Sequence, residues 1–386
     1  MKLIKTTEEL GEFCDYASQF NFVTIDTEFL REKTYYSQLC LVQMAVNDNG
    51  PNSAVIIDVL AQEINLDSLY KLMVNHSITK VFHAARQDIE IFYNLTGVVP
   101  HPIFDTQIAA MVCGFGEQVG YDNLVKNITS NTIDKSSRFT DWSRRPLTKE
   151  QLDYAIGDVT HLRNVYEYLK NQLEKNGRIT WVDEEMAILT SKNTYEINPH
   201  EAWKKIKVRT DTGKFLAILR EVACFREEYA QLKNIPKGRV LKDDAVVELC
   251  SAKPTNRDDL RKLRLYNRGN RSQELSDKLL RAVSVGMTCA PENYPSVSKD
   301  RKKENKSPAL SELLRVLLKS SSENIGVAQK LIATTSELDR VASGERVGTV
   351  FEGWRLEVFG RDALDLCDGK IGLSADGHRI KIIKVN

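Results

Sequence analysis

Short apolar runs separated by polar turns dominate the first hundred residues. Runs rich in Val, Ile and Phe predict four strands, at 21–29, 37–47, 54–59 and 78–84. The segment DNGPNS at 48–53 is a turn signal that joins the second strand to the third. Helical spacing predicts two helices, at 66–76 and at 87–97, where Gly97 ends the second. This succession of strands and helices predicts an α/β sheet flanked by helices.

The clearest amphipathic helix follows Pro146. Thr148 and Gln151 form a capping box at its start. One face then carries an apolar stripe at helical spacing: Leu152, Ala155, Val159, Leu162, Tyr166, Leu169 and Leu173. At about 100° per residue, Tyr154 and Asp158 fall beside this stripe. A side chain at the edge of the buried face reaches both the core and a cleft.

The strand signals fade after about residue 200. Residues 214–263 predict several short helices, and 310–344 predict a last helical block. The segment 291–309 between them is polar, charged and rich in turn residues, which is typical of a linker. We therefore predict four parts, which are a first domain at 1–200, a helical domain at 210–290, a linker at 291–309 and a second helical domain at 310–375.

Composition adds a charge asymmetry to this plan. The chain has 386 residues, a length typical of two or three domains, and a net charge of only +1. Residues 201–281 hold 20 Lys and Arg against 12 Asp and Glu, a surplus of eight, so the remainder sums to −7. Moderately basic domains are common, but an acidic part joined to a basic part also suits a protein that binds metal in one place and phosphates in another.

Targeting and redox signals are sparse. The N-terminal segment has no long apolar core, and no run approaches 18 apolar residues, so we expect neither a signal peptide nor a membrane span. The seven cysteines are scattered, and none forms a CxxC pair. This pattern favours reduced thiols over zinc or a disulfide framework, and we expect a cytoplasmic protein.

The candidate chemistry lies in three segments, VTIDTEF, FHAARQDIEIF and LDYAIGDVTHL. Asp26 and Glu28 are two apart on a strand, and Tyr154 and Asp158 are four apart on a helix, so each pair shares one face. Singly, such residues are more often solvated edges or helix caps, as Asp88 near a helix start would be. Four carboxylates in one pocket would repel each other unless divalent cations lay between them, and all-oxygen ligands suit Mg²⁺ or Mn²⁺.

The order and spacing of these segments resemble the three motifs of the DEDDy 3′–5′ exonuclease superfamily, and most closely those of the ribonuclease D family. The D-x-E motif matches Asp26–Glu28, the second motif matches Asp88 five residues after His83, and Y-x-x-x-D matches Tyr154–Asp158. FDTQIAA at 104–110 and DKSSRFTDWSRRPLTKEQLDYA at 134–155 are also similar to that family. The resemblance covers roughly residues 1–200. Gly157 departs from it, because relatives commonly carry another small residue such as alanine there.

The resemblance implies a ribonuclease H-like fold and a metal-dependent 3′–5′ exoribonuclease. Such an enzyme trims structured RNAs with a single-stranded 3′ end, including tRNA precursors, and releases 5′-mononucleotides. The catalytic residues would be Asp26, Glu28, Asp88, Tyr154 and Asp158. Asp26 would bridge two Mg²⁺ or Mn²⁺ ions, Glu28 and Asp158 would complete the site of one ion, and Asp88 would support the other. Tyr154 would orient the attacking water, because a phenol with a pKa near 10 is a poor base.

Residues 214–263 resemble an HRDC domain, mainly through REEYAQLKNIPKGRVLKDDAVVEL, and 310–373 resemble a second, more divergent HRDC module. The expected fold class is therefore an α/β ribonuclease H-like exonuclease domain followed by two small all-α HRDC-like domains. An HRDC module is either a nucleic-acid binder or a scaffold. We expect the chain to act as a monomer on RNA, away from membranes.

Several interpretations remain open at this stage. Trp142 with Arg144 and Arg145 would either contact RNA or pack under a loop. Asp105 of FDTQ fits a helix cap, and His83 fits a packed side chain better than a metal ligand. The alternatives for function are a catalytically quiet RNA-binding protein that acts through its HRDC modules, or an exonuclease of the same superfamily directed at DNA.

Overall fold

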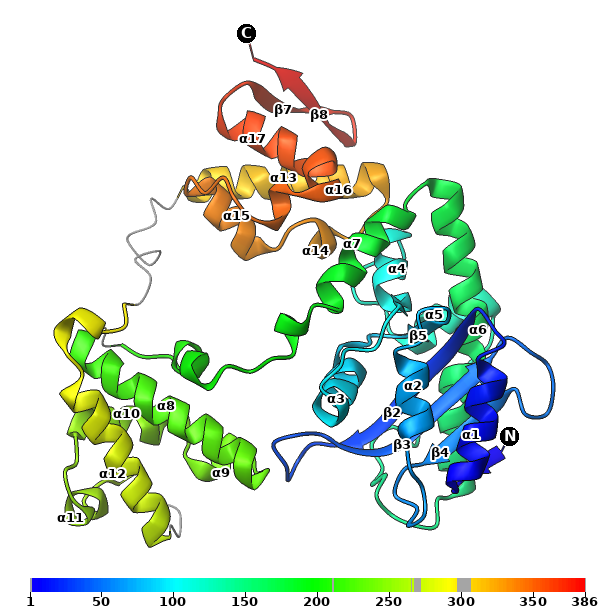
Figure 1. Cartoon of the computed structure of the whole chain (residues 1–386). Coiled ribbons are helices and arrows are strands. Elements are labelled where there is room, and N and C mark those ends of the chain that lie inside the picture. Colours follow the sequence, from blue (N-terminus) through cyan, green and yellow to red (C-terminus); the bar gives the residue numbers. More distant parts are fainter. Residues whose placement is uncertain (1, 210–211, 265, 267–271, 297–306, 386) are drawn as a thin grey trace. The chain divides into compact units, whose positions relative to one another are not determined.

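The computed structural model describes all residues except 1, 210–211, 265, 267–271, 297–306 and 386 (Figure 1). Its chain divides into two compact units. One unit contains 1–29, 39–194 and 303–386, and the other contains 30–38 and 195–302. Most of the predicted linker, 297–306, lies outside the described residues.

A six-stranded sheet in the order β1-β4-β3-β2-β5-β6 organises the first unit. Its strands are β1 (Lys2–Ile4), β2 (Phe22–Leu30), β3 (Gln38–Val46), β4 (Ala54–Asp58), β5 (Thr79–Phe82) and β6 (Ile103–Asp105). β3 and β4 are antiparallel and joined by the predicted turn, whereas β2, β5 and β6 pair in parallel. The four strands predicted from the sequence are confirmed as β2, β3, β4 and β5, and β1 and β6 add one strand at each edge.

Helices connect and cover these strands: α1 (Thr7–Ala17), α2 (Asp67–Met73), α3 (Arg86–Thr96), α4 (Thr106–Val112), α5 (Tyr121–Thr129), α6 (Lys149–Asn176) and α7 (Ile179–Leu189). The two helices predicted at 66–76 and 87–97 are confirmed as α2 and α3, and Gly97 ends α3 in the left-handed conformation. Helix α6 packs on one face of the sheet, where Val159 is buried with Ala45 and Ala54. The predicted capping box of Thr148 and Gln151 is present.

The C-terminal block, residues 307–385, belongs to the same unit as the sheet. It contains α13 (Pro308–Ile325), α14 (Gln329–Ile332), α15 (Thr335–Ala342), η6 (Thr349–Phe351), α16 (Gly353–Arg355), η7 (Leu356–Gly360) and α17 (Arg361–Cys367). It ends in an antiparallel hairpin of β7 (Ile371–Asp376) and β8 (Arg379–Lys384). The expectation of an all-α domain at 310–375 is therefore wrong for its last part. RIKIIK in β8 carries the β-branched residues and the alternation that favour a strand, and Gly377 supplies the turn.

The C-terminal block is joined to α7 by a buried ionic and aromatic contact. The rings of Trp181 and Trp354 stack with centroids 4.7 Å apart. Trp354 Nε1 donates to Glu185 Oε1 over 3.1 Å, and Arg355 contacts the same carboxylate at 2.7 and 2.8 Å. A carboxylate with a 7% exposed side chain is stable in the folded protein only with such partners. This joint, Glu185 with Trp354 and Arg355, makes the block part of the exonuclease unit.

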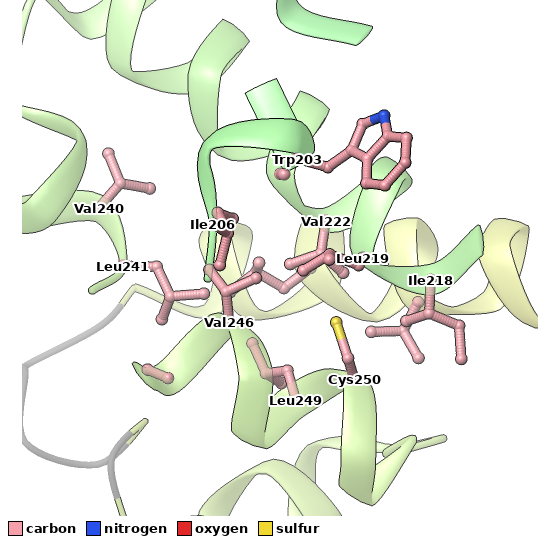
Figure 2. Close-up of a cluster of buried hydrophobic side chains, with 14 of the residues drawn as sticks. Trp203, Ile206, Ile218, Leu219, Val222, Val240, Leu241, Val246, Leu249 and Cys250 are labelled. Atoms are coloured by element: carbon pink, nitrogen blue, oxygen red, sulfur yellow. The ribbon is translucent and has the colours of Figure 1, made fainter. Parts of the chain in front are cut away.

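The second unit is a small helical domain with its own core. It contains η2 (Pro199–Lys205), α8 (Gly213–Lys233), α9 (Lys237–Val240), α10 (Asp243–Ala252), α11 (Arg257–Arg261), α12 (Gln273–Thr288) and η4 (Pro291–Asn293). Apolar side chains meet around α8 (Figure 2), and among them are Trp203, Leu219, Val222, Leu249 and Cys250.

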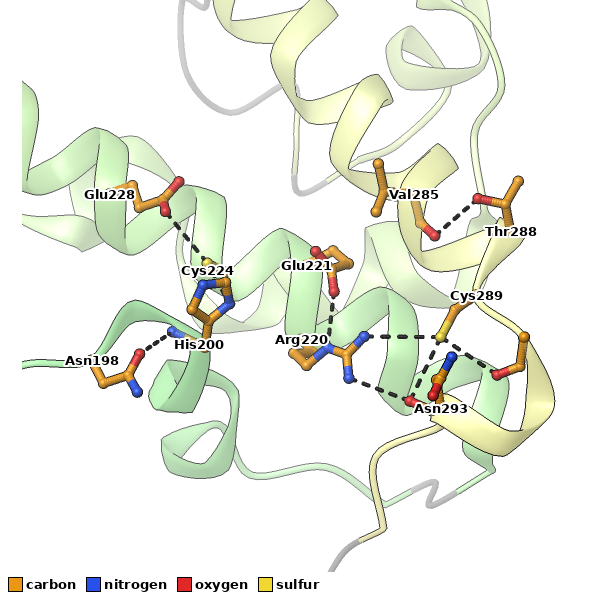
Figure 3. A network of polar contacts seen from close by, with 11 residues as sticks. Asn198, His200, Arg220, Glu221, Cys224, Glu228, Val285, Thr288, Cys289 and Asn293 are labelled. Atoms are coloured by element: carbon orange, nitrogen blue, oxygen red, sulfur yellow. Dashed lines mark hydrogen bonds and ion pairs between the residues drawn. The ribbon is translucent and has the colours of Figure 1, made fainter.

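Polar contacts fix the ends of this domain to α8 (Figure 3). The Arg220 guanidinium binds Glu221 at 2.9 Å and reaches the Asn293 carbonyl at 3.4 Å. Cys224 Sγ lies 3.5 Å from His200 Nδ1. The connection between β2 and β3 belongs to this unit as well, because Tyr35 donates its hydroxyl to Glu227 and the Tyr35 backbone N–H bonds to Asn234.

Candidate active site

Strand β2 directs two carboxylates to one face of the sheet. Side chains alternate along a strand, so Thr24, Asp26 and Glu28 share a face, and Thr27 points to the other. Thr24 Oγ1 donates to the carbonyl of Val159 on α6 over 2.8 Å, which identifies this face as the one that α6 covers. Asp26 and Glu28 therefore project on the side of α6.

Helix α6 supplies the other half of the site. Of the predicted apolar stripe, Ala155, Val159, Leu162, Tyr166, Leu169 and Leu173 are buried, whereas Leu152 is half-buried. Tyr154 and Asp158 are half-buried at the edge of this stripe, as their helical positions predict. They are one turn apart, and the Tyr154 hydroxyl donates a hydrogen bond to the Asp158 carboxylate.

Asp26, Glu28 and Asp158 form one oxygen cluster, with one carboxylate oxygen from each within 4.8 Å of the others. Among the residues that the structure describes, this is the one group of three or more acidic, Cys or His side chains so arranged. Carboxylate oxygens are hard ligands, which suits Mg²⁺ or Mn²⁺ and not the softer, thiolate-preferring metals. The donor set therefore fits the divalent cations expected from the sequence.

The electrostatics of the cluster lead to the same conclusion. Burial, with the charges of Asp26, Asp158 and Asp88 added, raises the pKa of Glu28 to about 10. Burial raises the pKa of Asp158 to about 7, against the opposing effects of the Tyr154 hydrogen bond and of Arg138. The pKa of Asp26 rises through burial and the neighbouring Asp158. Without a cation the cluster holds protons, and a divalent ion favours the ionised form of the carboxylates.

Asp88 lies close to this cluster but is not one of its three members. It is buried in the first turn of α3 and accepts a hydrogen bond from Thr27 Oγ1 over 2.5 Å. Burial raises its pKa, and the charge of Asp26 raises it further. Thr27 is a residue that the sequence analysis missed, although its position between Asp26 and Glu28 assigns it to the opposite face of the strand. Asp26 and Glu28 thus point to one face of β2, and Thr27 between them points to the other face and bonds to Asp88.

Asp105 organises the backbone before α3. Its carboxylate caps α4 by accepting from Gln107 N over 2.8 Å, which confirms the predicted cap. It also accepts from the backbone N–H groups of Ala84 and Ala85, at 3.0 and 2.8 Å. Ala84 has a positive φ of 59°, a conformation that a non-glycine residue adopts only when its surroundings hold it there. Asp105 thus fixes the turn that starts the helix of Asp88.

Of the other sequence candidates, His83, Trp142 and Arg145 are structural, whereas the Arg144 side chain is 83% exposed and lies 3.5 Å from Asp141. His83 packs beside Thr106, with Nδ1 3.0 Å from its hydroxyl oxygen, as expected. Trp142 is 2% exposed, so the packed alternative holds for it. Arg145 binds Asp58 with two nitrogens, at 2.8 and 2.6 Å, and also reaches three backbone carbonyls. Its guanidinium therefore stabilises the fold and is not available to bind RNA.

Comparison with known proteins places this geometry in a family. The family described as 3'-5' exonuclease matches residues 1–174, and the HRDC domain family matches residues 215–283. Ribonuclease D of Jannaschia sp. (strain CCS1) is 51% identical over 382 residues, or 99% of each chain. Ribonuclease D of Nitrobacter hamburgensis is 46% identical over 381 residues, or 98% of each chain. The chain belongs to the ribonuclease D family.

A solved structure agrees with this assignment. The crystal structure of Escherichia coli RNase D, described as an exoribonuclease involved in structured RNA processing, has a TM-score of 0.79 and 26% identity over 95% of this chain and 98% of that chain. The protein is therefore a 3′–5′ exoribonuclease of the ribonuclease D type. The expected α/β exonuclease domain and one HRDC domain are confirmed, whereas a second HRDC module in the C-terminal block stays a prediction.

Two further expectations from the sequence concern the metal and membranes. The exonuclease domain implies divalent cations, and the cluster of Asp26, Glu28 and Asp158 is the place where the described residues offer oxygen ligands for one. No helix within the described part of the chain is long and apolar enough to cross a membrane.

Proposed function

We propose that this protein trims the 3′ ends of structured RNAs, including tRNA precursors, by a two-metal hydrolysis that releases 5′-mononucleotides. The observation that carries the proposal is the oxygen cluster of Asp26, Glu28 and Asp158 at the edge of α6. Burial and mutual repulsion raise the pKa values of these three groups, so all of them ionise together only with a cation between their oxygens, and a protein that only binds RNA has no use for such a cation site. This arrangement favours catalysis over a protein that only binds RNA.

The carboxylates divide into two groups in this proposal. Glu28 and Asp158 would hold one cation together with Asp26, and Asp88 with Asp26 would support a second. The cations, when bound, lower the pKa of a water molecule and stabilise the charge that develops on the leaving 3′ oxygen. Two observations support the outer position of Asp88: it is not one of the three carboxylates of the oxygen cluster, and its strongest charge interaction is with Asp26.

Tyr154 would orient the attacking water and not deprotonate it. Burial raises the pKa of its hydroxyl above the usual value for tyrosine, and Asp158, Glu28 and Asp26 raise it further. The side chain therefore stays a neutral phenol at any physiological pH. Its hydroxyl bonds to Asp158, so it lies beside the oxygen cluster, where it can position a water molecule by hydrogen bonding.

The HRDC domain would add RNA contact, which the surplus of eight positive charges over residues 201–281 supports. We further propose that the protein acts as a monomer in the cytoplasm. All seven cysteines are free thiols, an arrangement that is stable in a reducing compartment.

The central test is a gel time course on 5′-labelled RNA with a short 3′ overhang, with Mg²⁺, with EDTA and with Asp26→Asn. We expect a ladder that shortens from the 3′ end only with Mg²⁺ and only with Asp26 intact. Asp153→Asn is the control, because it makes the same chemical change at an exposed carboxylate of α6, next to Tyr154 but outside the cluster. Equal RNA binding without shortening, in wild type and in Asp26→Asn, would instead favour the RNA-binding alternative. The same overhang made of DNA tests the third alternative, since equal rates on both would contradict a ribonuclease.

The role of Tyr154 has its own test. Tyr154→Phe removes one hydroxyl, and we expect turnover to fall by about 10- to 100-fold because the water loses its orientation. The Mg²⁺ concentration at half-maximal activity stays the same, because the phenol is not a ligand. Unchanged turnover with comparable Mg²⁺ titrations would contradict this role.

A further inference from the structure

The loop between α5 and α6, residues 131–147, is anchored beside the active site. Near its start, Lys135 Nζ binds Asp122 Oδ1 on α5 over 2.6 Å. In its middle, Thr140 donates to the carbonyl of Ser137 over 2.9 Å and accepts from Gln151 Nε2, in the first turn of α6, over 3.0 Å. The α5–α6 loop is therefore held on both sides by the helices that flank it.

The second half of the loop is fixed by buried groups. The Trp142 ring lies with its centroid 6.0 Å from that of Tyr154, so this part of the loop touches a predicted catalytic side chain. Arg145 closes the loop by its ion pair with Asp58 in β4. These contacts leave little freedom for the backbone between Lys135 and Arg145.

One aromatic side chain on this anchored loop is left in solvent. Phe139 is 91% exposed, although it lies next to Thr140, which is bonded to α6. A phenyl ring gains no stability from such a position, because its apolar surface stays in water. The Arg138 guanidinium lies over the same ring, 5.2 Å from its centroid. A cation and an aromatic face are thus presented together by a fixed backbone.

The positive charges of the loop reach the active site. Arg138 acts on the carboxylates of Glu28 and Asp158, and Lys135 acts on Asp158. Phosphate oxygens are bound by such cations, and bases stack on aromatic or guanidinium planes in single-stranded RNA. Of the three residues that the sequence suggested for this role, Trp142 is buried and Arg145 is bound to Asp58, whereas Arg144 is exposed and lies 3.5 Å from Asp141. Phe139 and Arg138 in the same loop are exposed as well.

We propose that Phe139 and Arg138 form the nucleotide-binding element of the α5–α6 loop. Phe139 stacks on a base of the RNA strand that enters the active site, and Arg138 contacts a phosphate of the same strand. Stacking on an aromatic ring is tolerant of sequence, because every base has a flat face, so the element suits an enzyme that shortens many different 3′ ends. The proposal rests on the exoribonuclease activity and deepens it.

Phe139→Ala is the first test, on a single-stranded oligoribonucleotide with Mg²⁺. Loss of one base–aromatic stack corresponds to about a 5- to 150-fold rise in KM. Hydrolysis of bis(p-nitrophenyl) phosphate, a diester without bases, stays at the wild-type rate. Phe139→Trp keeps a low KM, because it restores a stacking surface. The matched control Tyr168→Ala removes a 39% exposed aromatic ring from α6 and leaves KM unchanged.

A positional test locates the stacked base. A series of RNA substrates carries one abasic ribose at successive positions from the 3′ end. In the wild type one position raises KM as much as Phe139→Ala does, and in Phe139→Ala that position has no further effect. This non-additivity distinguishes stacking from a general loss of folding. An abasic effect that persists in full in Phe139→Ala would overturn the proposal.

Arg138 is tested through salt, because its charge also acts on the catalytic carboxylates. Arg138→Ala reduces the slope of log KM against log salt by about one unit, and Arg138→Lys restores it. An unchanged slope contradicts a phosphate contact.

The remaining outcomes are separable. A wild-type ladder with equal KM in Phe139→Ala overturns this inference alone, whereas absence of a wild-type ladder overturns the proposed function first. Sedimentation that shows a wild-type dimer, lost in Phe139→Ala, would assign the exposed ring to a second copy of the chain and overturn its role with RNA.

Discussion

The HRDC domain and the C-terminal block are both mainly helical, but different neighbours bury them. The HRDC domain folds around α8 and buries its own apolar side chains, Leu219 and Leu249 among them. The C-terminal block instead shares a compact unit with the exonuclease sheet, and its Trp354 and Arg355 surround Glu185 of α7. A helical segment next to a catalytic domain can therefore be a separate domain or a part of the catalytic unit. The two cases are distinguished by whether its buried side chains pack within the segment or against the catalytic unit.

This difference matters for dividing the chain. A truncation after residue 200 would remove the HRDC domain together with the partners of Glu185. A loss of activity in such a variant could then result from destabilisation, because Glu185 has lost its partners, as well as from the loss of RNA contact by the HRDC domain. The following predictions separate the two regions, beginning with the largest expected effect.

Glu185→Ala should break the joint of the C-terminal block. It leaves Arg355 as a mostly buried, unpaired cation and removes the acceptor of the Trp354 indole. We expect the free energy of unfolding of the exonuclease unit to fall by about 3–5 kcal/mol, measured by urea denaturation with tryptophan fluorescence. Glu323→Ala is the control, because it removes an exposed partner 4.0 Å from Lys319 and should change little. Equal effects of the two variants would show that the block is held by other contacts.

Leu219→Ala should break the HRDC domain alone. The side chain is fully buried in the core of that domain, and its truncation costs about 2–5 kcal/mol in stability. In calorimetry we expect the transition of the HRDC domain to move to lower temperature while that of the exonuclease unit stays in place. Leu232→Ala, at a 75% exposed position in α8, is the control. A single transition that moves as a whole would show that the two units unfold together.

Mg²⁺ and pH should act on the exonuclease unit only. The folded pKa values of Glu28 and Asp158, about 10 and about 7, lie above their ordinary values of 4.5 and 3.8. The folded state without metal thus binds more protons than the unfolded state between about pH 4 and 10, and its stability falls as pH rises through this window. Mg²⁺ at 100 times its Kd adds about 2.7 kcal/mol. At a fixed Mg²⁺ concentration this increment grows with pH, because the ligands must be ionised and Kd therefore falls.

Calorimetry at several pH values, with and without Mg²⁺, measures this effect. Asp26→Asn is the comparison variant and should lose the Mg²⁺ increment. The transition of the HRDC domain should not respond to Mg²⁺, because the carboxylate cluster found among the described residues lies in the exonuclease domain. An Mg²⁺ shift of equal size in both transitions would contradict the separation of the two units.

Lys330→Ala should have the smallest effect. Lys330 binds Glu117 over 3.2 Å between the C-terminal block and the exonuclease domain, but both side chains are exposed. Such pairs contribute about 0–1 kcal/mol and are screened by salt. We expect a change within this range in urea denaturation at low salt and none at 1 M NaCl. A loss comparable to that of Glu185→Ala would mean that surface charge, and not the buried joint, holds the block.

The part of the site that could be predicted from the sequence follows from the geometry of single strands and helices. The period of two along β2 places Asp26 beside Glu28, and the period of 3.6 along α6 places Tyr154 beside Asp158 at the edge of the buried stripe. Both follow from the spacing of apolar residues within single segments. The capping box at Thr148, the glycine end of α3 and the cap at Asp105 are also local, since each involves residues within four positions of one another.

Contacts between distant segments were not predictable in this way. The bond from Thr27 to Asp88, the turn that Asp105 holds before α3, and the joint of Glu185 with Trp354 each connect residues at least 20 positions apart. The sequence pattern also did not predict that Phe139 is exposed and that Trp142, three residues later, is buried, because both are aromatic residues in one polar loop. Packing against α6 separates them.

The sequence by itself thus determined on which face of its own strand or helix each candidate catalytic residue lies, because this depends on backbone geometry over a few residues. The tertiary structure decided which of those faces meet, which helical region completes the exonuclease unit, and which side chains of the α5–α6 loop remain free to bind RNA. These outcomes depend on side chains that are distant in the chain and compete for the same buried volume, a competition that local periodicity does not record.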